Sequence, residues 1–440
     1  MNTITEDFLR LPLRRAGTPR RDRPVARARR AAPRLTRPVF LDAGQVERLH
    51  RDIAALYDLL MALPERLTGG DLTRYGALLG LTGPQIEAAR RTARPGTPRL
   101  ARPDVYWTED GFRVLEMNAT SALGGVGISW QARLHLADPA VRAFVDARGL
   151  RCLDTMSLLA DEVRACCERR GHAGTLPVVA VVDSPAGYDA DPASSEFVAM
   201  MYAERGFTAR AADAGRLRRR DGGLWLDGLR VDVVHRMFLL EELVSESDAA
   251  AFEEVFRAQE ADEVLMMLPL DVEALCGKSA LAVLSDQRHR AVLSEEERAL
   301  VDRVLPWTGS MDAGKLLVDG EEVDPLDHCL AHREDLVLKP SWMHGGIGVL
   351  PGWTVPEREW RERVTAALGG PYVVQRRVVP APELFRSEET GALEPWVLNW
   401  GVFLVGDAFG GVQVRGLRAD APGAVVSQGD GASLSCCFSA

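Results

Sequence analysis

Two short segments carry the side chains best suited to chemistry. Arg102-Pro-Asp104 and Glu116-Met-Asn118 flank a turn at residues 109–111, and the residues between them follow the pattern of a two-stranded hairpin. Residues two apart in a strand face the same side, so Glu116 and Asn118 point together, and a tight hairpin sets Asp104 opposite them. Two carboxylates and an amide oxygen are the hard ligands that Mg²⁺ prefers. The alternative is a solvated hairpin with cross-strand charge pairs.

Lysine is rare in this chain, and two of its lysines lie in segments that suit phosphate binding. Among 53 basic residues, lysine occurs only as Lys278, Lys315 and Lys339. Lys339 ends an apolar strand that leads into a glycine-rich loop, whose backbone N–H groups can approach an anion closely. Lys278 begins a helix-like segment. A lysine beside a flexible glycine-rich cover is a recurrent nucleotide arrangement, although two lysines could also stand here by chance.

The composition is that of an ordinary globular protein. A chain of 440 residues, 46% of them hydrophobic, can bury a large core divided into two or three lobes. The formal charge of −10 argues against a dedicated nucleic-acid binder. The seven cysteines are scattered, as expected of reduced thiols, so we expect a cytoplasmic protein. No apolar stretch of ~18 residues and no signal-peptide pattern are visible, so we expect no membrane contact.

The positive charge is concentrated at the start of the chain. Residues 1–37 contain eleven arginines, three acidic residues and four prolines, which would interrupt a long helix. We expect an extension of the folded body that is solvated and partly docked. The alternative is an arm that binds RNA.

The rest of the chain divides into three predicted parts. Residues 38–150 begin with a helical lead-in and continue into the hairpin. Residues 151–260 alternate strands and helices, and the apolar strand at 177–183 is typical of a parallel sheet in a small α/β lobe. Residues 261–440 hold further helices, the Lys339 strand, its glycine loop, and strand-like segments at 372–375, 396–405 and 411–415 before a Gly/Ser-rich end.

These motifs, in this order, resemble a known family. The Asp and Glu-x-Asn hairpin, the Lys-Pro strand with its glycine loop, and Tyr372-Val-Val-Gln375 are similar to the circularly permuted ATP-grasp enzymes, which include glutathionylspermidine synthetase and related carboxylate-amine ligases. Conventional ATP-grasp chains begin with the lysines and end with the acidic metal site, whereas here the hairpin comes first. The resemblance covers residues 38–418. It implies an α/β (α+β) fold, a circularly permuted ATP-grasp with a small α/β pre-ATP-grasp-like lobe.

The resemblance also implies a role for each matching residue. The hairpin would ligate Mg²⁺ at the phosphates of ATP through Asp104, Glu116 and Asn118. Arg102 would stabilise the transition state. The nucleotide would be bound by Lys278 and Lys339, covered by Gly345, Gly346 and Gly348, with Gln375 at the adenine hinge. In the small lobe, Arg236 would bind a substrate carboxylate. His344 stands in the loop where the synthetase subgroup carries other polar residues, and no amidase domain is present.

These implied roles describe an ADP-forming ligase. It would join a small-molecule carboxylate to an amine through an acyl phosphate, with ATP and Mg²⁺ as cofactors. Two other hypotheses stay open. The chain could be a degenerate nucleotide-binding protein, or its basic N-terminus could dock a macromolecular substrate such as a peptide or an aminoacyl-tRNA.

Overall fold

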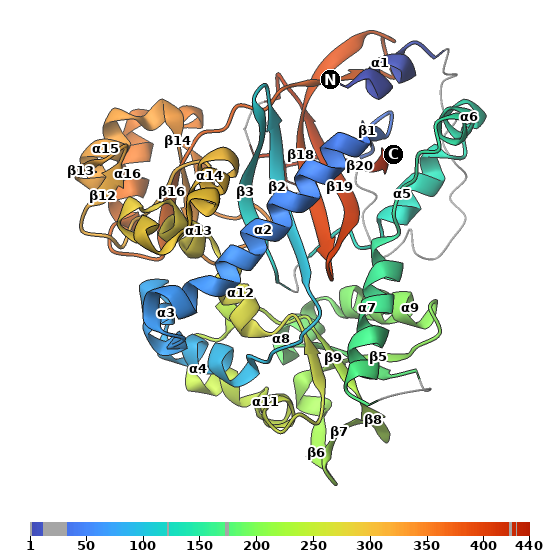
Figure 1. Ribbon diagram of the computed structural model, residues 1–440, viewed down its shortest axis with the longest axis vertical. Helices are drawn as coiled ribbons and strands as arrows, with labels where there is room; N and C mark the ends of the chain where they lie inside the picture. Colours follow the sequence, from blue (N-terminus) through green and yellow to red (C-terminus); the bar gives the residue numbers. More distant parts are fainter. Residues whose placement is uncertain (1, 12–32, 121–122, 172–175, 422–424, 428) are drawn as a thin grey trace.

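A seven-stranded sheet forms the centre of the protein (Figure 1). The computed structural model describes residues 2–11, 33–120, 123–171, 176–421, 425–427 and 429–440. The strand order of the central sheet is β1-β20-β19-β18-β2-β3, and β17 pairs with β18. These strands are β1 (Val39–Leu41), β2 (Leu100–Thr108), β3 (Gly111–Asn118), β17 (Glu383–Arg386), β18 (Leu393–Val405), β19 (Ala408–Arg418) and β20 (Ser433–Ser439). Both ends of the chain thus contribute strands to this sheet.

The predicted hairpin is β2 and β3. Its register pairs Arg102 with Asn118 and Asp104 with Glu116, and a bulge follows directly after Asp104. On its other edge β2 pairs with β18, where Gly401 stands opposite Asp104. The hairpin therefore lies at one edge of the sheet, with β3 as the edge strand, and β2 joins it to a strand that comes almost 300 residues later in the chain.

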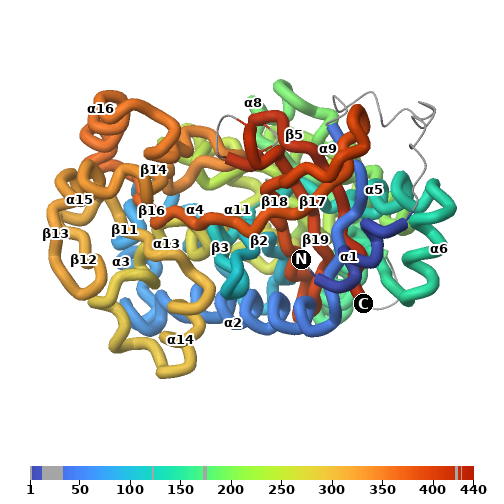
Figure 2. The backbone as a smooth tube through the Cα atoms, turned by 90° about the horizontal axis from the view of Figure 1, so that it is seen from above, coloured from blue at the N-terminus to red at the C-terminus, as the bar shows by residue number. Residues whose placement is uncertain are grey.

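Helix α2 (Ala43–Thr68) covers one face of this sheet (Figures 1 and 2). It begins with a capping box, in which Asp42 and Gln45 each accept the other's backbone N–H, and it ends at Gly69 with a φ of 63°. Its buried side chains recur at helical spacing and include Leu49, Ile53, Leu56 and Leu60. They join the apolar side chains of the strands in one hydrophobic core. On the other face, apolar side chains such as Tyr106 and Leu417 belong to a separate cluster, and polar side chains lie among them.

The predicted small α/β lobe is confirmed as a four-stranded parallel sheet of order β10-β9-β4-β5. Its strands are β4 (Val178–Asp183), β5 (Thr208–Asp213), β9 (Val233–Arg236) and β10 (Leu265–Met267). Helices α7 (Thr155–Arg169) and α9 (Pro192–Ala203) pack on it through a second core. A small antiparallel sheet extends from its lower edge in Figure 1 and consists of β6 (Arg218–Arg220), β7 (Gly223–Leu226) and β8 (Leu229–Val231). Helices α3 (Leu72–Leu78), α4 (Gly83–Thr92) and α11 (Glu253–Glu260) lie beside this lobe.

A third sheet carries Lys339 and Gln375. Its order is β11-β16-β14-β15, with β14 and β16 antiparallel. The strands are β11 (Thr308–Ser310), β14 (Leu336–Pro340), β15 (Leu350–Pro351) and β16 (Tyr372–Arg376), and the covering helices are α15 (Pro325–Ala331) and α16 (Glu357–Ala367). The two helices meet at the fully buried Trp360, whose indole N–H donates to the carbonyl of Cys329 at 2.8 Å. Helices α12 (Leu270–Cys276), α13 (Lys278–Ser285) and α14 (Glu295–Val304) lead into this lobe.

The ends of the chain are more ordered than the sequence suggested. The Gly/Ser-rich C-terminus contains a strand that was not predicted, β20, which pairs with β19 and, in parallel, with β1. Its small buried side chains fit between α5 (Ile128–His135) and the sheet. At the other end, α1 (Thr3–Leu9) buries Phe8 against Phe40 and Phe144.

The basic N-terminal segment is thus docked at both of its described ends. Residue Arg37 is 2% exposed, and its Nη2 lies 2.7 Å from Glu383 Oε2. The positions between these ends, 12–32, carry eight arginines and lie outside the described residues, so the proposed RNA arm falls there. Across the described part of the chain, no helix combines the length and the apolar character needed to cross a membrane.

Candidate functional site

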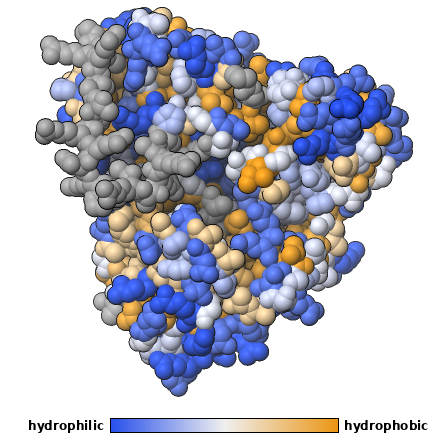
Figure 3. Space-filling view, turned by 180° about the vertical axis from the view of Figure 1, so that it is seen from behind, coloured by the Kyte–Doolittle hydropathy of each residue, from blue (hydrophilic) through white to orange (hydrophobic). Residues whose placement is uncertain are grey.

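A cavity of about 630 Å³ lies against the polar face of the central sheet, opposite α2. Its walls come from β2, β3, β18 and β19 on one side and from β14, β16 and the glycine loop on the other. Figure 3 views this side of the molecule, and the surface is hollowed near the centre of the view, beside the lobe that carries β14. The structure therefore brings the N-terminal hairpin and the Lys339 strand to one space.

The four hairpin residues singled out in the sequence all line this cavity. Asp104 and Glu116 are direct cross-strand neighbours, as the hairpin geometry predicts. The Nδ2 of Asn118 donates to Glu116 Oε1 at 3.1 Å, and Lys278 Nζ lies 3.1 Å from Glu116 Oε2. Each oxygen of this carboxylate therefore has a partner in the protein.

The two lysines reach the hairpin from two different elements, α13 and β14. Lys339 Nζ donates to Gln375 Oε1 at 2.6 Å, and Lys278 Nζ donates to the carbonyl of Met343 at 2.9 Å. The pKa of Lys339 is lowered to about 8, chiefly by burial and also by nearby Lys278, whereas the charges of Glu116 and Asp104 oppose the fall. Although burial alone would raise the pKa of Glu116, the ammonium groups of Lys278 and Lys339 hold it well below its usual range.

Three further polar residues of the cavity come from β18 and β19, where no site residue was predicted. Arg415 on β19 pairs with Asp104 Oδ2, and Asn399 on β18 donates to the same oxygen at 3.3 Å. Gln413 Oε1 accepts from Arg102 Nη1 at 3.2 Å. A signal for them exists in the sequence, because polar side chains at alternate positions interrupt otherwise apolar strands.

Glycine makes room for Arg102 in this arrangement. A Cβ on Gly401 would lie 2.8 Å from Arg102 Cδ. The guanidinium donates to the carbonyl of Gly124 at 2.6 Å, and its Nε lies 3.4 Å from Asp104 Oδ1. Arg102 is thus fixed on the sheet face with Asp104 beside it.

This buried group carries an excess of positive charge. It holds four cationic side chains, each at most 8% exposed, against the two carboxylates Asp104 and Glu116. The cations are Arg102, Lys278, Lys339 and Arg415. Together these six side chains carry two more positive than negative charges, and such an excess is costly away from water. Such a site favours an anionic ligand with more than one negative charge.

The same face also offers oxygen atoms suited to a hard cation. Asp104 Oδ1 and Asn399 Oδ1 are buried without a hydrogen-bond partner. With Glu116 and Asn118 they form a set of carboxylate and amide oxygens, the chemistry that Mg²⁺ prefers. No cluster of three or more His, Cys, Asp or Glu side chains suited to a metal occurs among the described residues. The donor set fits Mg²⁺ if amide oxygens and a bound anion complete its shell.

The glycine loop between β14 and β15 borders the cavity. The backbone takes positive φ at Gly345 (68°), Gly346 (84°) and Gly348 (72°). A Cβ on Gly346 would lie 3.2 Å from side-chain atoms of Val425 and Ser427, across the cavity mouth. Gly345 and Gly346 line the cavity, whereas Gly348 packs on Pro340, 2.8 Å from where its Cβ would stand.

Of the predicted site residues, Lys278 and Gly348 border the cavity without lining it. Arg236 does not line it either. It is fully buried, and its Nη1 lies 2.7 Å from Glu273 Oε2 on α12. Its guanidinium also donates to the carbonyls of Leu268 and Phe238. Because its charge is matched inside the protein, Arg236 is a structural ion pair, and we correct the expectation that it binds a substrate carboxylate.

Comparison with known proteins identifies the fold. No protein-family model matches the chain, and neither does any curated protein sequence. A solved structure of a glutathione synthetase-like effector from Globodera pallida matches with a TM-score of 0.52 and 13% identity, over 93% of this chain and 90% of that one. The chain thus has an ATP-grasp-like fold, which confirms the predicted fold class, whereas the circular permutation stays a prediction.

Two other solved structures are less similar. A putative gamma-glutamylcysteine synthetase from Methylobacillus flagellatus KT matches with a TM-score of 0.45 and 13% identity, over 92% of this chain and 89% of that one. D-alanyl-alanine synthetase A from Vibrio cholerae matches with a TM-score of 0.27 and 12% identity, over 51% and 68% of the two chains.

Proposed function

We propose that the protein is an ATP-dependent carboxylate-amine ligase. The observation that carries this proposal is the buried excess of positive charge on the sheet face, bordered by a glycine loop in an ATP-grasp-like fold. A nucleoside triphosphate supplies the negative charge that balances this excess. The similarity to the glutathione synthetase-like effector supports a ligase of this kind, and circular permutation is part of the same proposal.

The residues of the cavity divide the work of binding. Lys278 of α13 and Lys339 of β14 bind the phosphates as compact point charges. Gln375, which holds Lys339 in place, lies towards the adenine. Asp104, Glu116 and Asn118 would hold Mg²⁺, which would neutralise phosphate charge when bound. The glycine loop covers the phosphates and excludes water.

The proposed reaction has two steps. A substrate carboxylate attacks the γ-phosphate of ATP, which releases ADP and gives an acyl phosphate. An amine then attacks the acyl carbon, and phosphate leaves. The protein contributes position and charge: Arg102 and Arg415, held at Asp104, stabilise negative charge on the transferred phosphoryl group.

A paired screen tests the proposal. Amino acids as acids are combined with amino acids and polyamines as amines, and each mixture with Mg-ATP is assayed for ADP release and for the mass of an amide. We expect at least one pair to give ADP and amide in equal amounts. ATP binding without turnover of any pair would instead favour a degenerate nucleotide-binding protein.

The rare lysines provide a matched control for this screen. Lys339→Met should weaken ATP binding by about 2–3 kcal/mol, because it removes a charge-assisted contact in a desolvated site. Lys315 is 54% exposed in its side chain and lies 3.8 Å from Asp324, away from the cavity. Lys315→Met should leave ATP binding unchanged by calorimetry. Equal affinities in the two variants would remove the phosphate role of Lys339.

A further inference from the structure

His344 on the glycine loop lines the cavity next to two carboxylates from other elements. Its Nε2 lies 3.8 Å from Glu241 Oε2 and 3.7 Å from Glu273 Oε1. Both ring nitrogens are buried without a hydrogen-bond partner. Glu241 lies in η3 (Leu240–Glu242), just after β9, and Glu273 lies in α12. The glycine loop, η3 and α12 therefore meet at this imidazole.

The two carboxylates differ in what already binds them. Glu273 is 2% exposed and paired with Arg236, which keeps its pKa below the usual range although burial opposes this. Glu241 is different: its Oε2 is buried without a hydrogen-bond partner, and burial raises its pKa. Within the described part of the chain, its ion-pair partner is His344. Glu241 is thus the carboxylate free to orient the ring.

The imidazole is also connected to the phosphate side of the cavity. Lys278, which pairs with Glu116, donates to the carbonyl of Met343, the residue before His344. The charged groups around His344 and Glu241 are Glu273 with Arg236 behind it, Lys278, and the neighbouring Glu242. His344 therefore stands between the phosphate-binding cations and the acidic edge of the small lobe.

The proposed reaction requires a proton acceptor at such a place. When the amine attacks the acyl phosphate, a C–N bond forms, the C–O bond to phosphate breaks with its electron pair on the phosphate, and nitrogen must lose a proton. The four buried cationic side chains described above cannot accept this proton while they are themselves protonated. Asp104 and Glu116 are already bound by cations. A neutral imidazole is the usual side chain for this transfer.

Resting on the proposed function, we infer that His344 accepts the proton of the attacking amine and that Glu241 positions it. With Nε2–H directed at Glu241, Nδ1 is the basic nitrogen that faces the amine. A carboxylate that fixes the tautomer and orientation of an imidazole is a recurrent device in unrelated enzymes. The amine substrate then enters between the glycine loop and η3, next to the acidic edge of the small lobe, which suits a cationic amine.

Hydroxylamine distinguishes the attack of the amine, which needs a proton acceptor, from the formation of the acyl phosphate. It attacks acyl phosphates as a neutral molecule near neutral pH and needs no base from the protein, so hydroxamate reports acyl phosphate formation alone. For the acid and amine selected by the paired screen, His344→Ala should lower amide formation by roughly 100-fold. Hydroxamate formation should fall far less, so the ratio of hydroxamate to amide rises. Added imidazole should restore part of the amide formation.

Glu241 is tested through a double variant. Glu241→Gln should lower kcat for the amide more than it changes KM for ATP. If Glu241 acts through His344, the double variant with His344→Ala should be no slower than His344→Ala alone. The exposed His332, at the end of α15, provides the control His332→Ala, which should match the wild type in both products.

Each outcome decides the inference. Equal loss of amide and hydroxamate in His344→Ala, or loss of neither, overturns it and leaves the ligase proposal standing. A further fall in the double variant overturns the positioning role of Glu241. A wild-type protein that forms neither product from any acid and amine overturns the ligase proposal, and the inference with it.

Discussion

Asp104 and Glu116 stand directly opposite each other on neighbouring strands, yet their carboxylates are bound by cations from two different elements. Arg415 of β19 binds Asp104, and Lys278 of α13 binds Glu116. Two like charges side by side on a sheet would repel each other. Here they are separated by cations from two distant segments, so this pair joins the central sheet to the helices that precede the Lys339 lobe.

The first prediction concerns this pair. Glu116→Gln keeps the shape of the side chain but removes one charge, so it should reduce turnover by roughly 100-fold or more through loss of a metal ligand. Far-UV circular dichroism should show an unchanged fold. ADP release is the measurement, and Glu383→Gln, which changes a carboxylate far from the cavity that pairs with Arg37, is a control for charge removal. Full turnover in Glu116→Gln would contradict the ATP-grasp site.

The local parts of the fold and site could be predicted, because each depends on neighbouring residues. The β2–β3 hairpin follows from alternation around a turn, and it places Asp104 opposite Glu116 within one short segment. The parallel sheet follows from an apolar strand and the helices after it. In these segments a pattern of a few residues already determines the structure.

The long-range parts could not be predicted from such patterns. Arg415 reaches Asp104 across 311 positions, through the pairing of β18 with β2, and no local signal records that pairing. Arg236 was misplaced for the same reason. Its partner Glu273 lies on a later helix, so the sequence alone showed an unmatched arginine where the fold has a buried ion pair.

The second prediction concerns pH and nucleotide binding. Burial, opposed by Glu116 and Asp104, lowers the pKa of Lys339 to about 8. The ammonium is therefore charged below pH 8 and becomes neutral as pH rises through that value. ATP affinity should fall across this range, and binding above it should take up a proton. Calorimetry in buffers of different ionisation enthalpy measures both. Lys339→Arg should flatten the dependence of ATP affinity on pH. If the ATP affinity of the wild-type protein does not change between neutral and alkaline pH, the assignment is contradicted.

The third prediction concerns acid stability. His235 on β9 is 5% exposed, and its Nδ1 lies 3.1 Å from the hydroxyl of Tyr202. Burial, with Arg236 nearby, lowers its pKa to about 4 from an ordinary 6.5. Below 6.5 the unfolded chain binds a proton that the folded protein does not, so stability is complete above this pH and falls towards pH 4, by roughly 3 kcal/mol.

Denaturant titrations across this pH window provide the measurement. His235→Gln should reduce the acid-side loss of unfolding free energy, although His135, whose pKa burial also lowers to about 4, keeps part of it. The exposed His332 supplies the control His332→Gln, which should retain the full loss. An unchanged pH dependence in His235→Gln would show that His235 is not the group responsible.

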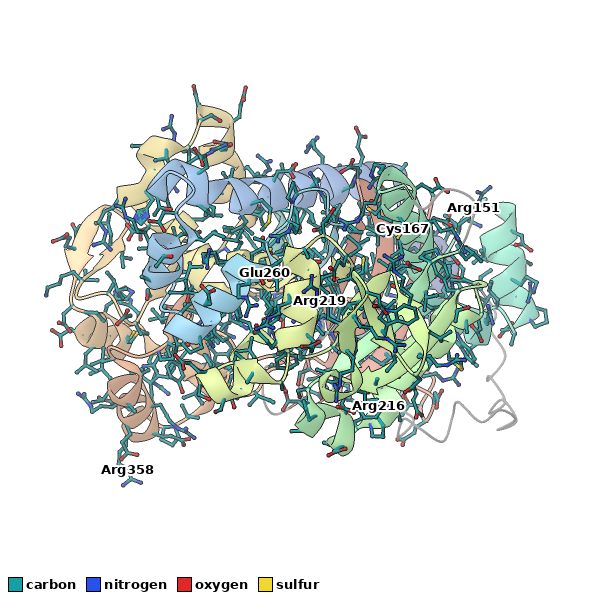
Figure 4. All side chains as sticks on the ribbon, turned by 90° about the horizontal axis from the view of Figure 1, so that it is seen from below. Arg151, Cys167, Arg216, Arg219, Glu260 and Arg358 are labelled. Atoms are coloured by element: carbon teal, nitrogen blue, oxygen red, sulfur yellow. The ribbon has the colours of Figure 1, made fainter. Side chains whose placement is uncertain are left out.

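The fourth prediction concerns the basic N-terminal segment. Two arginines near the small antiparallel sheet have acidic partners: Arg219 pairs with Glu263, and Arg216 pairs with Asp227 (Figure 4). Positions 12–32 hold eight arginines and one acidic residue. Changing these eight arginines to Gln preserves α1 and Arg37, which belong to the packed body. If the segment docks a macromolecular substrate, turnover of that substrate should fall while small-molecule turnover is retained.

The last prediction concerns the glycine loop as a barrier to water. Gly346 has a φ of 84°, which β-branched residues avoid, and a Cβ there would lie 3.2 Å from Val425 and Ser427. Gly346→Val should therefore keep the loop from closing against these residues. Water would then reach the acyl phosphate before the amine does, so ATP hydrolysis should rise relative to ligation.

The measurement is the ratio of phosphate released to amide formed, which should be near one in the wild type and above one in Gly346→Val. Gly369→Val is a control, because it also places a side chain at positive φ (69°) but has no atom within 4 Å of the added Cβ and lies away from the cavity. It should keep the wild-type ratio even if it lowers stability. A ratio that stays near one in Gly346→Val would show that the loop does not protect the intermediate. If the ratio rises equally in both variants, the extra hydrolysis comes from a general loss of stability and not from the loop, because of the two glycines only Gly346 faces the 425–427 segment.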